Sequence, residues 1–320
     1  MTHLKKDPTI SQEELADRMN ITRSAAAVHI SNLMRKGAIL GRGYILDERT
    51  GILVVGKIGL EISAQIEGSK IDISYGGMGY VMSLELIKQQ LTPTLFTVLG
   101  QDEIGDHIYN QLLQNGVNVQ HIVRTPSYPT PKRLFVRNRN TKLYQVTEVK
   151  NDYKLNEETR KVRDDLMKSA KVLLLDGTIA EPEIDSLCVQ IKEYELLTTI
   201  FGSSLNWCQQ KGLLQCSQIF LVCHDHELVK FFGGFQVGVP ESCFPVCREI
   251  LKHGLAALIV IFGQQGLVLA TEKEIVFLPA SPLKGTGTKI SITAGVAGGL
   301  AAGYGFRLAA RRALGKSELS

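Results

Sequence analysis

The sequence predicts an α/β domain with a doubly wound, mostly parallel sheet, preceded by a small helical domain. From Ile52 onward, short apolar runs such as ILVV, LFTVL, VLLL, IFLV and LIVIF alternate with segments of helical spacing. This alternation is expected for strands that are buried on both faces and covered by helices. Before Asp47 the pattern differs, with two helical segments and two short strands. We therefore predict domains at residues 1–48 and 49–320.

Composition indicates a globular protein without disulfide bonds. The 320 residues are 44% hydrophobic and carry a net charge of +4, which permits a nucleic-acid partner without requiring one. Six scattered cysteines and no signal peptide favour reduced thiols in a cytoplasmic protein. The longest uncharged run, Ile290 to Phe306, is rich in Gly and Ala and predicts a buried helix rather than a membrane span.

The N-terminal segment predicts two helices joined by a short turn. Ser11 and Glu14 have the spacing of a capping box that opens the first helix. Asn20 and Ile21 form the expected turn, and Thr22 can cap the second helix. The apolar positions expected to face inward are Leu15, Ala16, Met19, Ala26, Ile30, Leu33 and Met34.

Two short strands with GRG at their tip follow the helices, and this order resembles a winged helix-turn-helix DNA-binding domain. No acidic residue lies between Asp17 and Asp47, so the basic side chains there suit phosphate contact. The alternative is a solvated basic face on a protein-interaction helix pair. A homodimer is expected, because such modules commonly read two-fold sites. The residues predicted to contact DNA are Arg23, Ser24, Ala25, His29, Arg35, Lys36 and Arg42.

Two glycine-bounded stretches stand out in the larger domain. The segment ISAQIEGSKIDISYG alternates polar and apolar residues and predicts a small antiparallel flap, which could pair across a dimer. Near the C-terminus, SPLKGTGTKISITAGVAGGLAAG places a glycine-rich turn before a long helical segment. Such a turn can hold an anion, because the first N–H groups of a helix have no internal partner. It lacks a carboxylate: after Glu274, the next acidic residue is Glu318.

The larger domain resembles the ribokinase-like sugar and nucleoside kinases of the phosphofructokinase B type. The resemblance rests on VVGKIGLEI, a Gly-Gly pair, VLGQDEIGDHIYNQLLQNGV, GQQG and the terminal glycine loop. Together with the N-terminal module, the chain is similar to pseudouridine kinase-like proteins that carry a helix-turn-helix. The family implies ATP and Mg²⁺, and transfer of the γ-phosphoryl group to a sugar hydroxyl.

This sequence departs from the family at the position of the catalytic base. The family's loop has the form DTxGAGD, and its last Asp accepts the hydroxyl proton. Here the loop reads PLKGTGT, so Thr288 stands at the base position, and a neutral hydroxyl is too weak a base. The loop keeps an anion-binding character, and we expect phosphate contacts from Lys284, Gly285, Thr286 and Gly287. Lys289 adds a second positive charge beside the turn.

Other family positions are altered in the same direction. The resemblance implies substrate contacts at Glu61, Gly76, Gly77 and Val81, where Glu61 replaces an Asp and Val81 replaces an Asn. It implies a nucleotide and magnesium region at His224, Glu227, Gly263 and Gly266, where His224 replaces an Asn. Glycines persist where polar side chains have been lost, a pattern typical of a retained fold with altered chemistry.

Four further features have competing interpretations. The CHDH stretch with Cys243 and Cys247 could bind zinc, but it coincides with the family's nucleotide region, so a structural role is favoured. Asp102 is interpreted as part of a strand-to-helix turn. Asp176 ends a strand, where it either touches a nucleotide or closes a turn, and the sequence leaves both open. Trp207 is interpreted as a packing residue.

Three hypotheses of function follow. The favoured one is a DNA-binding transcriptional regulator whose kinase-like domain senses a sugar, nucleoside or phosphorylated metabolite, with phosphotransfer weak or lost. The second is an active ATP-dependent sugar or pseudouridine kinase, against which the missing base argues. The third is a degenerate scaffold that binds neither ligand, against which the basic helix-turn-helix argues. The ligand, the DNA target and the sign of regulation are not specified by the sequence.

Overall fold

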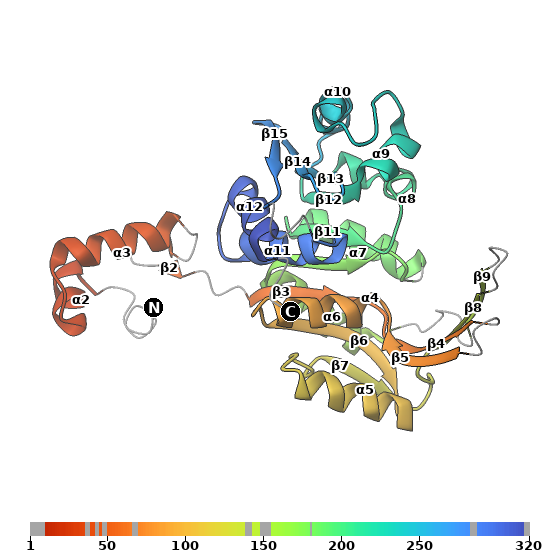
Figure 1. Cartoon of the computed structure of the whole chain (residues 1–320). Coiled ribbons are helices and arrows are strands. Elements are labelled where there is room, and N and C mark those ends of the chain that lie inside the picture. The colour runs from red at the N-terminus through yellow and green to blue at the C-terminus, as the bar shows by residue number, and fades with distance from the viewer. Residues whose placement is uncertain are drawn as a thin grey trace.

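The structure, a computed structural model, describes residues 10–35, 39–41, 45–46, 50–65, 70–137, 143–147, 155–179, 181–281 and 287–316. It confirms the predicted α/β class. A large, mostly parallel sheet lies between two layers of helices, a smaller sheet projects from one edge, and a pair of helices forms the N-terminal part (Figure 1).

The large sheet has nine strands in the order β15-β14-β13-β12-β11-β10-β3-β6-β7. All neighbours are parallel except β13–β14 and β14–β15. The chain runs outward from β3 through β6 to β7 and then returns to β10 on the other side of β3. Ligands of such sheets bind at the carboxyl ends of the strands where the order reverses, here between β3 and β10. The strands are β3 (Thr50–Val55), β6 (Pro93–Gly100), β7 (Ile122–Thr125), β10 (Ala170–Asp176), β11 (Leu197–Phe201), β12 (Ile219–His224), β13 (Ala257–Ile261), β14 (Gly266–Thr271) and β15 (Ile275–Pro279).

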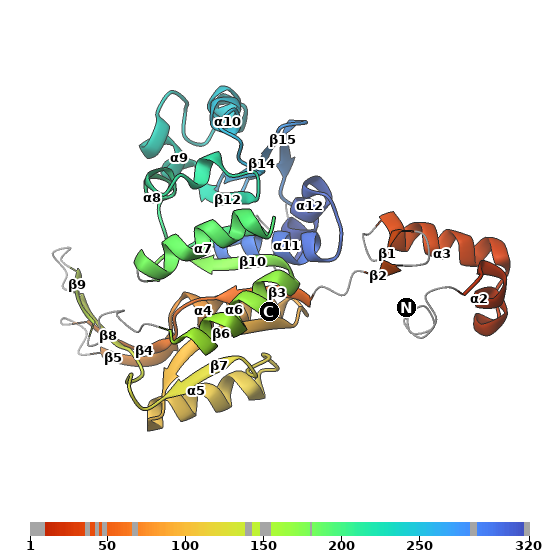
Figure 2. The ribbon, with the colours of Figure 1, turned by 180° about the vertical axis from the view of Figure 1, so that it is seen from behind.

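Two hydrophobic cores lie on the two faces of this sheet, because successive side chains of a strand point to opposite faces. In β3, Ile52 and Val54 belong to one core and Leu53 and Val55 to the other. Figures 1 and 2 show the two helical layers from opposite sides. The first core is covered by α4 (Met78–Lys88), α5 (Glu103–Gln114), α11 (Lys289–Ala301) and α12 (Phe306–Lys316). The second is covered by α6 (Glu157–Ser169), α7 (Glu181–Glu193), α8 (Leu205–Gln210), α9 (Asp225–Phe232), α10 (Phe244–Leu251) and the 3₁₀ turns η1 (Leu213–Gln215) and η2 (Pro240–Cys243).

Helix α11 is the Ala/Gly-rich helix predicted from the sequence, and it is buried. Its small residues have a packing reason, because α12 crosses it at close range. A Cβ atom on Gly299 would lie 2.7 Å from Cβ of Ala309, and one on Gly295 would lie 2.8 Å from Cβ of Ala313. None of the helices in the described part of the chain is long and apolar enough to cross a membrane.

The smaller sheet, hereafter the lid, contains the predicted flap and two strands that the sequence did not predict. The flap forms the antiparallel hairpin β4–β5. Strand β8 then pairs with β4 in parallel, and β9 pairs with β8 antiparallel, so the lid is larger than predicted and not wholly antiparallel. The lid strands are β4 (Gly59–Gln65), β5 (Lys70–Gly76), β8 (Lys132–Arg137) and β9 (Leu143–Thr147).

The N-terminal part consists of α2 (Gln12–Met19), α3 (Arg23–Arg35) and a short antiparallel pair, β1 (Ile39–Gly41) with β2 (Ile45–Leu46). The capping box of Ser11 and Glu14 is confirmed, and the Thr22 hydroxyl accepts the N–H of Ala25 at 3.1 Å. A small core forms from Ile10, Leu15, Ile30 and Ile39, with Leu33 packed against it. The inward placement of Met19 and Met34 was wrong, since they are 46% and 43% exposed.

Candidate functional site

The carboxyl ends of β3 and β10 are joined through Asp176. This side chain is fully buried, and its carboxylate accepts the N–H of Lys57 at 3.0 Å. It also accepts the N–H of Thr178 at 2.9 Å and the Thr178 hydroxyl at 2.7 Å. Because these donors all lie on the strand ends, the geometry favours turn closure among the two roles that the sequence left open. Burial lowers the pKa of Lys57, against the opposing effect of Asp176.

Three predicted substrate residues, Glu61, Gly76 and Gly77, lie where the lid meets helix α4. Glu61, on β4, accepts the N–H of Gly77 at 3.0 Å and pairs with the guanidinium of Arg133 at 2.6 Å. Gly77 has a φ of +93°, and a Cβ atom there would lie 2.4 Å from the carbonyl oxygen of Lys57. The structure thus brings Glu61 beside Gly76 and Gly77, and glycine is required at position 77.

Val81 lies one turn into α4 and is 36% exposed. Its side chain has no atom that can form a hydrogen bond with a sugar hydroxyl.

The start of α9 carries the predicted nucleotide residues His224 and Glu227. The N–H of His224 donates to Oε2 of Glu227 at 2.7 Å. The ammonium of Lys289 reaches both Glu227 oxygens, at 3.0 Å to Oε1 and 2.8 Å to Oε2. Burial would raise the pKa of Glu227, but the hydrogen bonds from Lys289 and the His224 N–H outweigh it and lower that pKa. Lys289 was expected to favour phosphate directly, whereas here it pairs with a carboxylate.

The start of α11 carries Thr288, the residue at the expected base position. Its hydroxyl accepts the N–H of Ser291 at 3.1 Å and so caps the helix. Gly287 precedes it with a φ of +84°. The predicted phosphate residues Lys284, Gly285 and Thr286 lie outside the described residues. The geometry assigns the Thr288 side chain a role at the helix end, which is independent of proton transfer.

A cavity of about 400 Å³ lies between these helix starts and the end of β11. Its described lining contains one carboxylate, that of Glu227, and one ammonium, that of Lys289. The remaining wall is apolar apart from hydroxyl groups. The residues that line this cavity are Met78, Met82, Ile200, Phe201, Gly202, Ser203, Ser204, Val222, Glu227, Lys289, Ile290 and Thr293.

The remaining predicted nucleotide residues do not line this cavity. Gly263 lies in the turn between β13 and β14, and Gly266 begins β14. They sit at the same edge of the sheet as His224, because His224 and Ile261 are register partners in β12 and β13.

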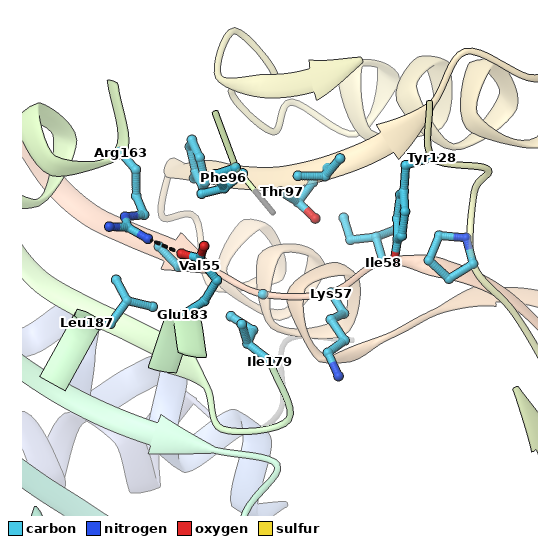
Figure 3. A pocket seen from close by; sticks show the side chains of 14 residues that line it. Val55, Lys57, Ile58, Phe96, Thr97, Tyr128, Arg163, Ile179, Glu183 and Leu187 are labelled. Atoms are coloured by element: carbon cyan, nitrogen blue, oxygen red, sulfur yellow. Dashed lines mark hydrogen bonds and ion pairs between the residues drawn. The ribbon is translucent and has the colours of Figure 1, made fainter. Parts of the chain in front are cut away.

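A second cavity, of about 100 Å³, lies beside the reversal point of the sheet and was not predicted. Figure 3 shows its apolar wall, formed in part by Val55 and Phe96, and the ion pair of Arg163 with Glu183 at one end, 2.7 Å long. Arg163 is 1% exposed. Its burial could have been suspected from the sequence, because Arg163 lies four residues before Met167 and therefore on the same face of α6, which is the buried face.

Asp102 caps α5 and fastens the segment that follows β7. It accepts the N–H of Gly105 at 2.8 Å, the N–H of Thr130 at 2.7 Å and the Thr130 hydroxyl at 2.7 Å. Burial would raise the pKa of Asp102, but these hydrogen bonds lower it. The contacts support the architectural interpretation of this residue.

The cysteines near the CHDH stretch are buried in the second core. The Sγ atoms of Cys243 and Cys247 are 3.7 Å apart, and both side chains are fully buried. The hydrogen bond to Cys243, together with burial, raises the pKa of Cys247 far above its ordinary value. Within the described residues, no group of three or more His, Cys, Asp or Glu side chains is arranged to hold a metal ion. Trp207 packs against this same core.

Five of the seven predicted DNA-contacting residues lie along α3, whose buried side is formed by Ala26 and Ile30. Arg23, Ser24 and His29 are exposed, and Ala25 is half-buried. Arg35, at the end of the helix, is also exposed and contacts Asn32. Lys36 and Arg42 lie outside the described residues. Of the predicted residues on this helix, Arg23, Ser24, His29 and Arg35 therefore face solvent.

Comparisons with known proteins match both parts of the chain. The model of the pfkB family carbohydrate kinases matches residues 52–319, and a winged helix-turn-helix DNA-binding model matches residues 1–39. The chain is 32% identical over 195 residues to the uncharacterized sugar kinase YeiI of Escherichia coli K12. That alignment covers 57% of this chain and 53% of the relative, so the chain spans about half the length of this curated relative.

Solved structures show the same fold. Ribokinase of Arabidopsis thaliana, complexed with ribose and ATP, superposes with a TM-score of 0.65 at 17% identity, covering 84% of this chain and 92% of that one. A putative sugar kinase from Clostridium perfringens gives a TM-score of 0.69 at 15% identity, with coverage of 84% and 89%. The resemblance to carbohydrate kinases of the pfkB type, preceded by a winged helix-turn-helix, is confirmed by the two family models.

Proposed function

The chain belongs to the pfkB family of carbohydrate kinases and matches a winged helix-turn-helix at its N-terminus, and from this premise we propose that it is a DNA-binding transcriptional regulator. Its kinase-like domain, residues 49–320, binds a sugar, nucleoside or phosphorylated metabolite. ATP is a candidate nucleotide ligand, but transfer of its γ-phosphoryl group by this domain is weak or lost. The protein acts in the cytoplasm, which its six free cysteines support.

The observation that carries this proposal is the chemistry at the start of α11. The hydroxyl of Thr288 serves as a helix cap at the expected base position. Glu227, the only carboxylate in the described lining of the cavity, accepts two hydrogen bonds from the ammonium of Lys289. These bonds favour its charged form and lower its pKa. A positioned general base contributes on the order of 10²–10⁴-fold to a rate, so a site without one binds better than it reacts.

Matched variants at Thr288 test the loss of transfer. Asp and Asn are comparable helix caps, but only Asp supplies a carboxylate. With ATP, Mg²⁺ and a panel that includes ribose and pseudouridine, we expect only residual sugar-dependent ADP production from the wild type and from Thr288→Asn. Thr288→Asp should produce ADP about 10²-fold faster than Thr288→Asn with the sugar that fits. Wild-type turnover of about 1–100 s⁻¹, typical of kinases, would overturn the proposal.

The second candidate function is an active sugar or pseudouridine kinase, and family membership is the observation that favours it. The same ADP measurement distinguishes the two. A ligand that raises the melting temperature of the wild type without ADP production supports sensing, because preferential binding stabilises the folded state.

DNA binding is proposed for the exposed face of α3. Phosphate contacts make affinity fall with salt, with a slope of about 0.9 per neutralised phosphate. Arg23→Gln should therefore lower affinity for a duplex selected from random sequence and reduce the salt slope by about 1. Arg307→Gln is the control, since Arg307 lies on α12 and pairs with Glu274. Equal effects of both variants would show that total charge, rather than α3, governs binding.

We expect a homodimer, and the outer face of the lid supports it. Two rows of apolar residues cross its four strands in register, and such exposed apolar surfaces commonly mark interfaces. Ile71 and Ile73 are 68% and 67% exposed, and Tyr144 and Val146 are 55% and 60% exposed. The first row is Ile73, Ile62, Leu134 and Val146, and the second is Ile71, Ala64, Val136 and Tyr144.

Light scattering after gel filtration tests this interface. Val146→Lys places a charge in the apolar face, whereas Gln145→Lys places it on the opposite face, because successive residues of a strand alternate. We expect the first variant to be monomeric and the second to remain dimeric. A wild-type monomer, or dissociation by both variants, would contradict a lid-mediated dimer.

A further inference from the structure

The wall of the cavity between α4, α9 and α11 includes a positively charged side chain, that of Lys289. Lys289 is the first residue of α11, and its ammonium lies within 3.0 Å of both oxygens of Glu227. A second donor, the backbone N–H of His224, reaches Oε2 at 2.7 Å. The two side chains are 29% and 36% exposed, so the pair stands at the cavity wall rather than in bulk solvent.

This arrangement does not fit the Mg²⁺ ion that the family implies. Mg²⁺ requires closely spaced oxygen ligands, usually including one or two carboxylates, at about 2.0–2.1 Å. Glu227 is the only carboxylate in the described lining of the cavity, and an ammonium already contacts both of its oxygens. A divalent cation would have to displace Lys289 or share a carboxylate with it against their mutual repulsion.

A neighbouring acidic group, Asp225, is also engaged. Asp225 accepts the N–H of His226 at 2.8 Å and the N–H of Gly238 at 2.9 Å. It is buried behind the start of α9 and does not line the cavity. The charge that faces the cavity is therefore set by the Glu227–Lys289 pair.

We propose that Lys289 takes the place of the divalent cation, so that this site binds nucleotide phosphates without Mg²⁺. The inference rests on the proposed function only in requiring that the kinase-like domain binds a nucleotide. Lys289 neutralises Glu227, which would otherwise repel an approaching phosphate group. It also adds a positive charge beside the N-terminus of α11, where the helix dipole already favours anions.

Charge accounting predicts the behaviour of variants. Lys289→Met keeps most of the apolar stem and removes the charge, leaving Glu227 uncompensated at the cavity wall. ADP should then bind weakly in EDTA, and Mg²⁺ should restore binding by bridging the carboxylate and the phosphates. The double variant Lys289→Met/Glu227→Gln carries neither charge and should bind independently of Mg²⁺ again.

Titration calorimetry with ADP, in EDTA and in Mg²⁺, tests the proposal on the full chain. For the wild type we expect the two dissociation constants to agree within about twofold. For Lys289→Met we expect about tenfold tighter binding with Mg²⁺, the equivalent of about 1.4 kcal/mol. Melting curves confirm that each variant is folded. Fluorescence provides a second readout, because the single tryptophan, Trp207, donates its backbone N–H to the cavity residue Ser204 at 3.2 Å.

Two results would overturn the inference. Wild-type binding that requires Mg²⁺ would show that Lys289 yields its position to the metal, while the proposed sensing function would stand. No ADP binding under either condition would remove nucleotides as ligands of this cavity. Sugar or nucleoside sensing and DNA binding, measured separately by thermal shift and salt titration, would then decide the proposed function.

Discussion

Two carboxylates lie at the predicted substrate and nucleotide positions, and each is paired with a basic side chain, but the partners come from different parts of the fold. Glu61 accepts a backbone N–H from the start of α4 and a guanidinium, and Glu227 accepts a backbone N–H from the start of α9 and an ammonium. Glu61 and Arg133 are register partners on adjacent lid strands. Glu227 and Lys289, by contrast, are 62 residues apart on two different helices.

This difference in location gives the two ion pairs different structural roles. The Glu61–Arg133 pair is internal to the lid, so it persists if the lid moves as a unit, and the Gly77 N–H is what ties it to α4. The Glu227–Lys289 pair joins α9 to α11 across the cavity, so its charges define what the cavity accepts. The first pair concerns lid position, and the second concerns ligand charge.

Among the substitutions considered, one at Gly77, where the Glu61–Arg133 pair is tied to α4, should have the largest effect on stability. Gly77→Val introduces a side chain at a φ of +93° and 2.4 Å from a backbone oxygen. We expect a loss of about 3 kcal/mol in unfolding free energy, measured by urea denaturation. Gly263→Ala is the control, because its φ is +51° but no atom lies within 4 Å of the added Cβ. It should cost about 1 kcal/mol. Equal losses would place the strain in φ alone.

The Glu61–Arg133 pair should show a measurable coupling. Arg133→Met leaves a partly buried carboxylate without its cation, and we expect a loss of about 1–2 kcal/mol. The double variant Arg133→Met/Glu61→Gln should recover most of it, and with the single variant Glu61→Gln it should give a coupling energy of about 1 kcal/mol. Hydrogen exchange should accelerate in β4 and β8 and stay unchanged in α11. Acceleration in both regions would mean that the two pairs are not independent.

The fold could be predicted from the sequence because its strands are continuous apolar runs with helices between them. Strands β8 and β9 were missed, since KRLFVR and LYQVT are short and lie among charged residues. The pairing of β8 with β4 is set by long-range contacts that have no local signature. The Ala/Gly content of α11 was visible, whereas its cause, the close approach of α12, required the structure.

The site was predictable only in part. The glycine turn and the missing acid at Thr288 were visible because they are local features. The pairing of Lys289 with Glu227 was not, because spacing along the chain does not show which helix starts converge. The cavity beside Arg163 and Glu183 was missed for the same reason, since its walls come from β3, β6, α6 and α7.

Loss of the helix cap at Thr288, at the start of α11, should lower the unfolding free energy by a smaller amount. Thr288→Ala removes the acceptor for the Ser291 N–H, and such losses cost about 1 kcal/mol. Thr288→Ser keeps the hydroxyl and should be nearly neutral. Thermal or urea denaturation measures both. If both substitutions cost the same, the methyl group rather than the cap would be the stabilising feature.

The smallest effect concerns the pH dependence of the Glu227 side. In the folded protein the pKa of Glu227 lies below its ordinary value of 4.5, because hydrogen bonds from Lys289 and His224 outweigh burial. A lowered pKa means that the unfolded chain takes up the proton first. The stabilisation from ionised Glu227 is therefore fully present above about pH 4.5 and is lost as the pH falls through the lower, folded-state pKa.

His224 titrates in a neighbouring range and must be removed from the measurement. Burial lowers the pKa of His224 below its ordinary value of 6.5. The unfolded chain therefore takes up this proton first, and the folded state loses stability as the pH falls below 6.5. The comparison is therefore made between His224→Gln and His224→Gln/Glu227→Gln, both of which keep the backbone N–H at position 224. Their difference in unfolding free energy should stay constant from pH 8 to about pH 5.5 and shrink below about pH 4.5. A difference that grows in acid would mean that Glu227 is held neutral in the fold, and Lys289 could then not serve as its counter-ion.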